Sequence, residues 1–379
     1  MLSWRDPKHP QAGGAEVVTY EVLRRMVQAG HQVTWFAARW PGAAAEQTLA
    51  GVRIVRAGRQ WSVHYRAWRW LRGRLDDFDV VVDQINAIPF MTPWYVPKAK
   101  RRFFIHQLAR EYWWTEPPGL FRLGAPLGYL LEPWMLRRYR GTTGMTVSES
   151  TKADLANIGI PESNLTIIPE AITIAPLRKL TAKSGPWTVV MVGRLTPAKY
   201  VHEGIAAFRE LKARLPEARL WIVGGGPAAY RSRLERLVRR WNLADVTFYG
   251  YVTQEKKEEL LTQAQVHLIT SHREGWGLAV SEAAAVGTPS VGYDVPGVRD
   301  SIGESSLLGS KGQPETLAKL LQGLGDDPRR YETLRQKMWH RSRSLNYQQT
   351  TKVFSMATGL VPPSASATAR LSPTGRRHT

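Results

Sequence analysis

The sequence contains no cysteine, and this absence removes several kinds of chemistry at once. Without thiols, disulfides, thiolate zinc sites and thiol nucleophiles are excluded, which agrees with a reducing compartment. Apolar runs are also short, and none approaches the ~20 residues that a membrane-spanning helix needs. Residues 1–10 are too polar for a signal peptide. We therefore expect a cytoplasmic protein that at most lies against the cytoplasmic face of a membrane.

Length and apolar content indicate two globular domains. The chain has 379 residues, of which 43% are hydrophobic, and this is too long for one ordinary core. Strand-like and helical segments alternate throughout, which is typical of α/β proteins with doubly wound parallel sheets. We expect a first domain over residues 1–172, a linker over 173–186 and a second domain over 187–344.

Both ends of the chain depart from this regular pattern. Only Met1 and Leu2 precede a polar stretch, which leaves too few residues for a full opening strand. We expect that the first strand is truncated and that the natural product begins several residues upstream. Residues 359–379 are rich in Pro, Ser, Ala and Arg and lack periodicity, so we expect a disordered basic tail.

Positive charge is the strongest bias in composition, with a formal net charge of +20. Residues 52–75 hold seven arginines and no acidic residue, interleaved with tryptophan and tyrosine. Such a basic, aromatic surface suits an anionic membrane surface. Nucleic acid is a competing interpretation that no nucleic-acid motif accompanies, and a solvated face requires no partner at all.

The segment from Glu274 to Glu282, Glu-Gly-Trp-Gly-Leu-Ala-Val-Ser-Glu, says most about function. It follows an apolar run at 266–269 and leads into a helix, so both carboxylates can face one crevice. Gly275 and Gly277 allow close backbone approach and leave N–H groups free at a helix start. Sugar hydroxyls suit the carboxylates, and phosphate suits the amides.

A loop between an apolar strand and a helix provides a candidate phosphate site. Gly193 permits a tight turn, Arg194 can hold two phosphate oxygens, and Lys199 adds a compact charge. Two cations here would neutralise a departing diphosphate, whereas the alternative is a solvated loop with incidental charges. The run 224–226 of three glycines also follows a strand, but a helix-starting loop needs no ligand.

Two further candidates lie in the first half of the chain. Gly13 and Gly14 open a helix, where their amides can approach a ligand across a cleft or simply start the helix. His106 ends the strand expected at 102–105, on the edge where open parallel sheets place their ligands. We expect His106 to hydrogen-bond near a transferred sugar, and a structural histidine is the alternative.

In their order along the chain, these pieces resemble the retaining family 4 glycosyltransferases of GT-B fold, the glycosyl transferases of group 1. The resemblance covers about residues 3–358, and the Glu-Gly-Trp-Gly-Leu stretch is its most specific part. It implies two Rossmann-like domains that face each other across a cleft. The first would bind the acceptor and the second the nucleotide-sugar, and a helix over 345–358 would cross back to the first.

The resemblance also implies a role for each candidate residue. Arg194 and Lys199 would stabilise the diphosphate, Glu274 would contact hydroxyls of the donor sugar, and His106 would touch the sugar near its reacting carbon. These four would be catalytic. Substrate binding would fall to the ribose contact of Glu282 and to the backbone or close approach of Gly13, Gly14, Gly193, Gly275, Trp276, Gly277 and Leu278.

By the same resemblance, the reaction needs neither a cofactor nor a metal ion, because two cations stabilise the leaving group. The acceptor would attack the face that the nucleotide leaves, so the glutamates are not the acid and nucleophile of a glycosidase. We expect a GDP- or UDP-sugar donor and a glycan or lipid-linked acceptor, in cell-envelope polysaccharide or glycolipid synthesis. The alternatives are a sugar-nucleotide epimerase of the same fold and a non-catalytic basic membrane- or nucleic-acid-binding protein.

Two positions depart from the family pattern. Tyr200 follows Lys199 where the family usually has Gly or Asn, which would narrow the pocket or change how the loop closes. Pro169-Glu170 replaces a common Asn-Gly pair, and this puts one contact to the nucleotide in doubt.

Overall fold

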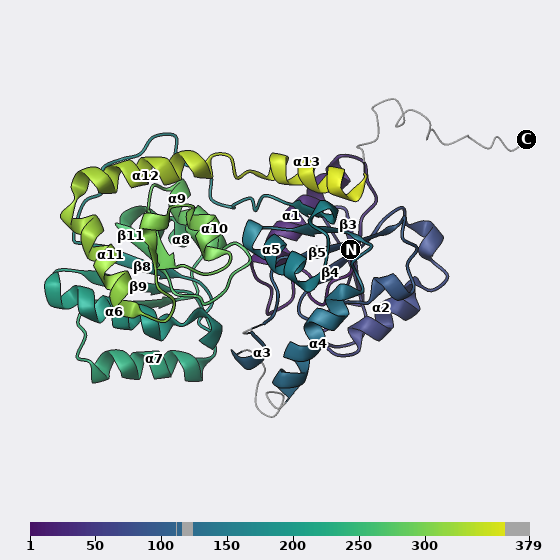
Figure 1. Cartoon of the computed structure of the whole chain (residues 1–379), viewed down its shortest axis with the longest axis horizontal. Coiled ribbons are helices and arrows are strands. Elements are labelled where there is room, and N and C mark those ends of the chain that lie inside the picture. Colours follow the sequence, from purple (N-terminus) through teal and green to yellow (C-terminus); the bar gives the residue numbers. More distant parts are fainter. Residues whose placement is uncertain (111, 116–123, 361–379) are drawn as a thin grey trace, which may run out of the picture.

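The computed structural model describes residues 1–110, 112–115 and 124–360. Two α/β bodies lie side by side, one from the first half of the chain and one from the second (Figure 1). Within the described ranges, no helix is both long enough and apolar enough to span a bilayer. The tail predicted at 359–379 lies outside the described residues from 361 onward.

The sheet of the second half is parallel throughout, with strand order β10-β9-β8-β11-β12-β13. The chain starts at the centre with β8, builds one side, and returns to build the other from β11, which is a doubly wound order. Val189 and Met191 join one apolar cluster and Val190 joins another, because alternate side chains of a strand point to opposite faces. The strands are β8 (Thr188–Val192), β9 (Arg219–Val223), β10 (Val246–Gly250), β11 (Val266–Ile269), β12 (Ser290–Tyr293) and β13 (Leu308–Gly309).

Helices cover this second sheet, and the last described helix, α13, continues beyond it to the first half (Figure 1). Their bounds are α6 (Val201–Arg214), α7 (Ala228–Arg240), α8 (Gln254–Gln263), α9 (Leu278–Ala285), α10 (Val298–Ile302), α11 (Pro314–Asp326), α12 (Pro328–Ser342) and α13 (Tyr347–Thr358). The prediction of an α/β protein with doubly wound parallel strands is confirmed.

The first half contains two strand groups, β2-β3-β1 and β4-β5-β6-β7, which Leu2 joins. The Leu2 amide donates to Val82 and its carbonyl accepts from Gln84, while the Ser3 amide donates to Phe36 on the other side. The opening residues thus lie between β1 and β4, and Leu2 takes the position of a strand between them. The strands are β1 (Thr34–Ala37), β2 (Glu46–Leu49), β3 (Val52–Arg56), β4 (Val81–Ile85), β5 (Arg101–Ile105), β6 (Thr143–Thr146) and β7 (Leu165–Ile167).

The helices of the first half include three that sequence patterns did not predict, α2, α3 and α5. In α2, Val63, Ala67 and Leu71 are buried at a spacing of four residues, while Trp61 before the helix and Tyr65 within it are exposed. The basic, aromatic segment is therefore half core and half surface. The helices are α1 (Gly14–Gln28), α2 (Val63–Leu71), α3 (Tyr112–Thr115), α4 (Ala125–Arg137) and α5 (Glu149–Ile158).

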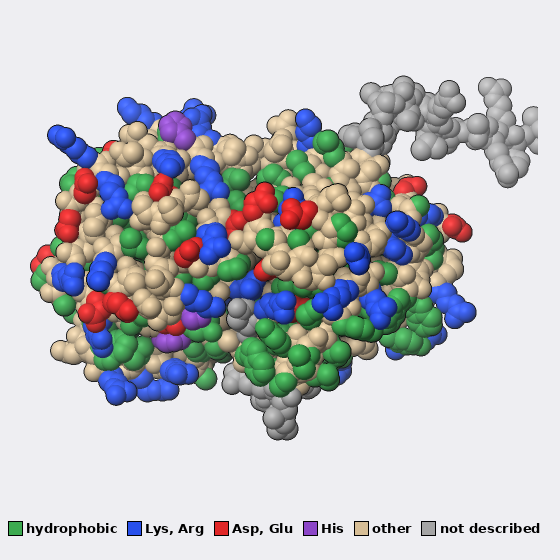
Figure 2. Space-filling model, in the orientation of Figure 1, with side chains coloured by type: hydrophobic (Ala, Val, Ile, Leu, Met, Phe, Trp, Pro, Cys, Tyr) green, Lys and Arg blue, Asp and Glu red, His purple; other side chains and the backbone are tan. Residues whose placement is uncertain are grey.

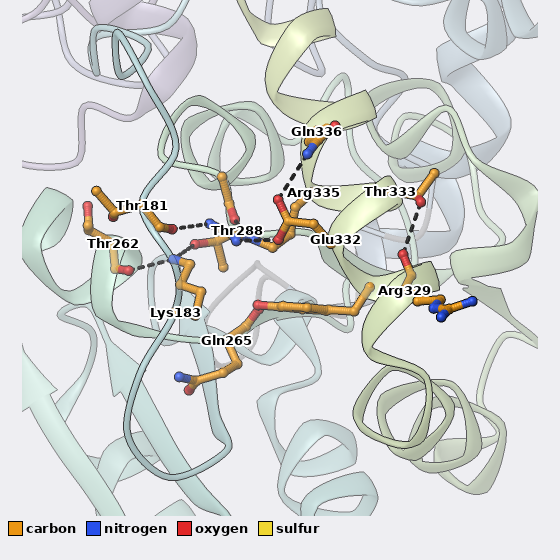
Figure 3. A network of polar contacts seen from close by, with 12 residues as sticks. Thr181, Lys183, Thr262, Gln265, Thr288, Arg329, Glu332, Thr333, Arg335 and Gln336 are labelled. Carbon is orange, nitrogen blue, oxygen red and sulfur yellow. Dashed lines mark hydrogen bonds and ion pairs between the residues drawn. The ribbon is translucent and has the colours of Figure 1, made fainter.

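The connector between the halves is fixed to the second one. The Leu177 amide donates to Ala285, and the Arg335 guanidinium donates to the Thr181 carbonyl at 2.8 Å. Lys183 donates to the Thr288 hydroxyl at 2.6 Å and to the carbonyl of Thr262 (Figure 3). These contacts make residues 177–183 part of the second body.

The final described helix, α13, returns to the first half and packs on α1. Phe354 of α13 is buried in a cluster with Phe104 of β5 and Met145 of β6. Burial of a phenylalanine side chain contributes about 1.5–3 kcal/mol, so this one residue is a substantial anchor.

Candidate active site

The order of the second sheet places a crevice where the winding reverses, between β8 and β11. Doubly wound sheets bind ligands at the carboxyl ends of the strands on either side of such a point. Here those ends lead into the loop from Gly193 to Lys199 and the loop from Thr270 to Gly277. Both segments that the sequence singled out thus meet at the topological switch point.

The glycine run 224–226 packs against the loop after β8. A Cβ atom on Gly226 would stand 2.1 Å from the Leu195 carbonyl oxygen, and one on Gly224 would stand 1.8 Å from that of Gly193. The Leu195 amide donates to the Gly225 carbonyl at 2.8 Å. Close approach of two backbones therefore explains Gly224 and Gly226, and neither needs a ligand.

Lys199 and Glu274 join the two loops as an ion pair. The Ser271 hydroxyl donates to the same Glu274 oxygen at 2.6 Å, and the Thr270 hydroxyl donates to the Lys199 carbonyl at 2.9 Å. Burial, the largest single influence, lowers the pKa of the Lys199 ammonium, but the charge and hydrogen bond of Glu274 together with Tyr112 outweigh burial and raise it. Lys199 therefore stays charged at any physiological pH.

Tyr200, the departure after Lys199, has a left-handed backbone conformation with φ of 48°. Its ring stacks on His272 with the centroids 3.4 Å apart. His272 in turn lies 3.0 Å from a carboxylate oxygen of Glu203 on α6. Tyr200 is thus packed on the next loop, beside Lys199 in sequence, and ties the loops after β8 and β11 together.

Arg194 has an exposed side chain that makes no hydrogen bond or ion pair with any residue of the described ranges. Its charge acts on Lys199 and opposes the raised pKa of that ammonium. The site therefore offers one cation already balanced by Glu274 and a second whose guanidinium is available to an anionic ligand.

Glu282, on α9, is held by groups that the sequence did not indicate. Lys257 of α8 donates to both carboxylate oxygens, at 2.7 and 2.8 Å. Thr173 of the connector donates to one of them at 2.9 Å. The two glutamates therefore have different partners. Lys199 and Ser271 bind Glu274, whereas Lys257 and Thr173 bind Glu282.

Two candidate residues of the first half, Gly14 and His106, lie in close contact with the second half. A Cβ atom on Gly14 would lie 2.5 Å from Leu278, and one on Gly275 would lie 2.5 Å from the His106 carbonyl oxygen. The Trp276 side chain packs against the apolar cluster of the first half, and its indole N–H donates to Ser281 at 2.9 Å. Gly14 and Gly275 thus lie at the contact between the halves, whereas a Cβ atom on Gly13 would meet only Glu16 of its own half and one on Gly193 would meet nothing within 4 Å.

Three further contacts join the two halves near Glu274. Arg273 pairs with Asp154 of α5, and the Tyr112 hydroxyl of α3 donates to the Arg273 carbonyl at 3.3 Å. The Asp300 carboxylate accepts from the Ser150 amide at 3.1 Å. The two halves are therefore in contact around the loop from Thr270 to Gly277, which contains Glu274.

His106 lies between two polar side chains of the first half. Its Nδ1 atom is 3.2 Å from a carboxylate oxygen of Glu170, and its Nε2 atom is 3.3 Å from the amide nitrogen of Gln84. Gln84 donates to Thr19 at 2.8 Å. Glu170 is buried, and its position in the family pattern marked it only as a departure, so its contact with His106 could not have been read from spacing.

No group of three or more His, Asp or Glu side chains in the described part of the chain is placed to hold a metal ion. The expectation of metal independence remains a prediction.

Comparison with known proteins identifies relatives of both halves. The family described as Glycosyltransferase Family 4 matches residues 12–175, and the family described as Glycosyl transferases group 1 matches residues 176–341. Together these matches run without a gap over most of the chain.

Two curated relatives are similar to part of this chain. The 2-deoxystreptamine glucosyltransferase of Streptomyces kanamyceticus is 30% identical over 224 residues, which are 55% of this chain and 57% of that protein. The D-inositol 3-phosphate glycosyltransferase of Thermomonospora curvata is 32% identical over 183 residues, which are 46% of this chain and 42% of that protein. The chain thus spans about half the length of the curated relatives it matches.

A solved structure covers nearly the whole chain. Sucrose-phosphate synthase from Thermosynechococcus elongatus superposes with a TM-score of 0.75 at 20% identity, over 94% of this chain and 96% of that one. At this identity the likeness shows the fold alone, and it agrees with the two α/β halves described above.

Proposed function

The chain belongs to the glycosyl transferases of group 1 and has the GT-B fold, and on this premise we propose that it moves a sugar from a nucleotide-diphosphate sugar to an acceptor. The observation that carries the proposal is the Lys199–Glu274 ion pair at the switch point of the second sheet, beside the exposed Arg194. A cation pair suits a diphosphate, and a carboxylate next to it suits sugar hydroxyls.

In the proposed reaction, the bond between the anomeric carbon and the diphosphate oxygen breaks while the acceptor oxygen bonds to the same face of that carbon. Lys199 and Arg194 stabilise the negative charge on the leaving diphosphate. A phosphate oxygen takes the acceptor proton, so the configuration is retained without a carboxylate nucleophile. Glu274 orients the sugar, and Glu282 binds the ribose hydroxyls of a GDP or UDP donor.

The first half supplies the other wall of the cleft. Gly14 lies against Leu278 and His106 against Gly275, so the first half closes over the proposed sugar position. We assign acceptor binding to this half, with a glycan or a lipid-linked saccharide as acceptor. Its exposed tryptophans, Trp61, Trp94, Trp114 and Trp134, support either choice, because aromatic rings stack on sugars and also lie at membrane interfaces.

The experiment is a hydrolysis and transfer screen with GDP- and UDP-sugars, using wild type, Glu274→Ala and Lys199→Ala. We expect both variants to lose at least about a hundredfold in turnover of the accepted donor. Lys212→Ala is the matched control, because Lys212 also pairs with a carboxylate, that of Asp245 at 2.7 Å, away from the switch point. Undiminished turnover in both site variants would overturn the proposal.

The same screen separates the alternatives. A sugar-nucleotide epimerase would change the donor sugar in the absence of acceptor, and a non-catalytic basic protein would consume no donor. The paired carboxylates and cations at one crevice favour the transferase, since a binding module has no need of both.

A further inference from the structure

We propose that the outward face of α4 is a membrane-docking surface for a bilayer that contains anionic lipid. We also propose that the acceptor is an amphiphile that enters the cleft from that bilayer, and this second part rests on the proposed transferase function.

Four large apolar side chains of α4 lie exposed along one stripe of the helix. Leu127 is 60% exposed, Leu130 71%, Leu131 40% and Trp134 44%. Their spacing of three and four residues places them on a single face. A stripe with this spacing normally faces a core, so its exposure marks an interaction surface.

The opposite side of α4 is fixed to the body of the protein. Ala125 and Leu136 are buried, and the buried Glu132 carboxylate accepts hydrogen bonds from the amides of Ala109 and Arg110. Rotating the leucines inward would remove Glu132 from both of these donors and leave its charge unsatisfied. The hydrogen bonds of Glu132 therefore fix the orientation of α4 so that its leucines face outward.

The charges around this stripe match an anionic bilayer. The Arg110 guanidinium lies over the Tyr129 ring and that of Arg138 over the Trp134 ring, at 5.4 and 4.5 Å from the centroids. Glu132 is the only acidic residue of α4 and is buried. Hydrophobic side chains gather over α4 at the lower centre of Figure 2, with Lys and Arg side chains along their border. Apolar side chains that enter the acyl boundary beside arginines that meet phosphate groups are typical of interfacial helices.

The surface adjoins the cleft through α3. Trp113 packs against Gly128 of α4, where a Cβ atom would stand 2.4 Å from its ring. The neighbouring Tyr112 donates to the carbonyl of Arg273, and Glu274 is the next residue. Among the described residues, α3 thus connects this surface to the loop from Thr270 to Gly277, which a head group carried by a lipid in the bilayer would have to reach.

The test is flotation of the full chain with vesicles of phosphatidylcholine alone and with about 30% phosphatidylglycerol. Wild type should float with the anionic vesicles and not with the neutral ones. Leu130→Glu should lower the bound fraction about tenfold, because it places a charge in the apolar boundary. Met356→Glu is the matched control, since Met356 is 72% exposed but lies on α13, and it should bind as wild type does. Arg138→Gln should weaken binding less, and added salt should weaken it further.

Donor hydrolysis without vesicles separates this proposal from the proposed function. Leu130→Glu should hydrolyse donor as wild type does and should lose transfer only to a vesicle-borne acceptor. If wild type fails to bind anionic vesicles while hydrolysing donor, the docking surface is wrong and the transferase stands. Equal binding of Leu130→Glu and wild type would also overturn it, as would a dimer in solution that Leu130→Glu converts to monomer while vesicle binding persists.

Discussion

Gly275 and His106 lie so close that a Cβ atom on Gly275 would stand 2.5 Å from the His106 carbonyl oxygen. Gly275 lies in the loop from Thr270 to Gly277 of the second half, and His106 directly follows β5 of the first. The backbones of the two halves therefore meet next to Glu274, and closure of the cleft depends on a residue without a side chain.

The first prediction concerns this contact. Gly275→Ala should lower transfer about tenfold or more, because a methyl group holds the halves apart and displaces the reacting groups. Nucleotide binding to the second half should change far less. Gly141→Ala is the control, since a Cβ atom there would meet nothing within 4 Å. Steady-state transfer and calorimetric nucleotide affinity measure the two effects, and full activity in Gly275→Ala would contradict the closed arrangement.

Lys257 is predicted to position Glu282 for the ribose. Lys257→Met removes both hydrogen bonds to the carboxylate, so the KM for donor should rise about tenfold while kcat changes by less than about twofold. Lys256→Met is a matched control, because Lys256 lies on the same helix and pairs with Glu259 on the exposed side. A lower KM in Lys257→Met would show instead that the lysine competes with the ribose.

Glu170 is predicted to orient the His106 ring. Glu170→Ala removes its carboxylate neighbour and should lower kcat about tenfold, with nucleotide affinity unchanged. Glu170→Gln keeps an oxygen at the same place and should recover part of the loss. Glu162→Ala, at a carboxylate that is 65% exposed, should have no effect. Equal kcat values for Glu170→Ala and wild type would assign His106 a role independent of this neighbour.

Transfer should be undiminished in excess chelator. Lys199 and Arg194 provide the positive charge that a metal ion supplies to a departing diphosphate in other transferases. The measurement is the initial rate with and without EDTA after dialysis against it. Complete loss that added Mg²⁺ or Mn²⁺ restores would show that a metal carries this role.

The stability of the protein should depend on pH through Lys183. Burial, and next the charge of Arg335, lowers the pKa of this ammonium from 10.5 to about 7. Between these values the unfolded chain binds a proton that the folded chain has released, so this group makes stability rise with pH. Lys183→Met should lack this contribution, and its Tm relative to wild type should fall from pH 7 to pH 10. A constant difference across that range would contradict the lowered pKa. Lys212→Met should show no comparable trend.

The strands that border the donor site could be predicted from local pattern. The apolar strand expected before Gly193 is β8, and the segment from Glu274 to Glu282 leads from the end of β11 into α9 as its pattern indicated. Apolar runs flanked by glycine-rich loops encode these elements locally. The same sequence could not show that Leu2 fills a sheet position between β1 and β4, because that place depends on two strands far along the chain.

Local sequence pattern could not predict the partners of the site residues either, because these contacts also depend on the tertiary fold. Lys257 lies on a polar helix with no motif, and it meets Glu282 only because α8 and α9 pack together. Likewise, the leucines of α4 have the spacing of a core-facing helix, and only the placement of Glu132 determines which side faces out. Spacing gives the face of a helix, whereas the tertiary fold decides what that face meets.

The chain passes between the two halves twice, once after Pro169, which accepts from Thr350 of α13, and once between Ser342 and Asn346. That hydrogen bond joins the two crossings, so they lie beside each other. Rotation of one half against the other at these crossings would break the contacts of Arg273, Tyr112 and Asp300 across the cleft. Such a rotation would also carry Gly275 away from His106, so the residue without a side chain marks where the cleft opens.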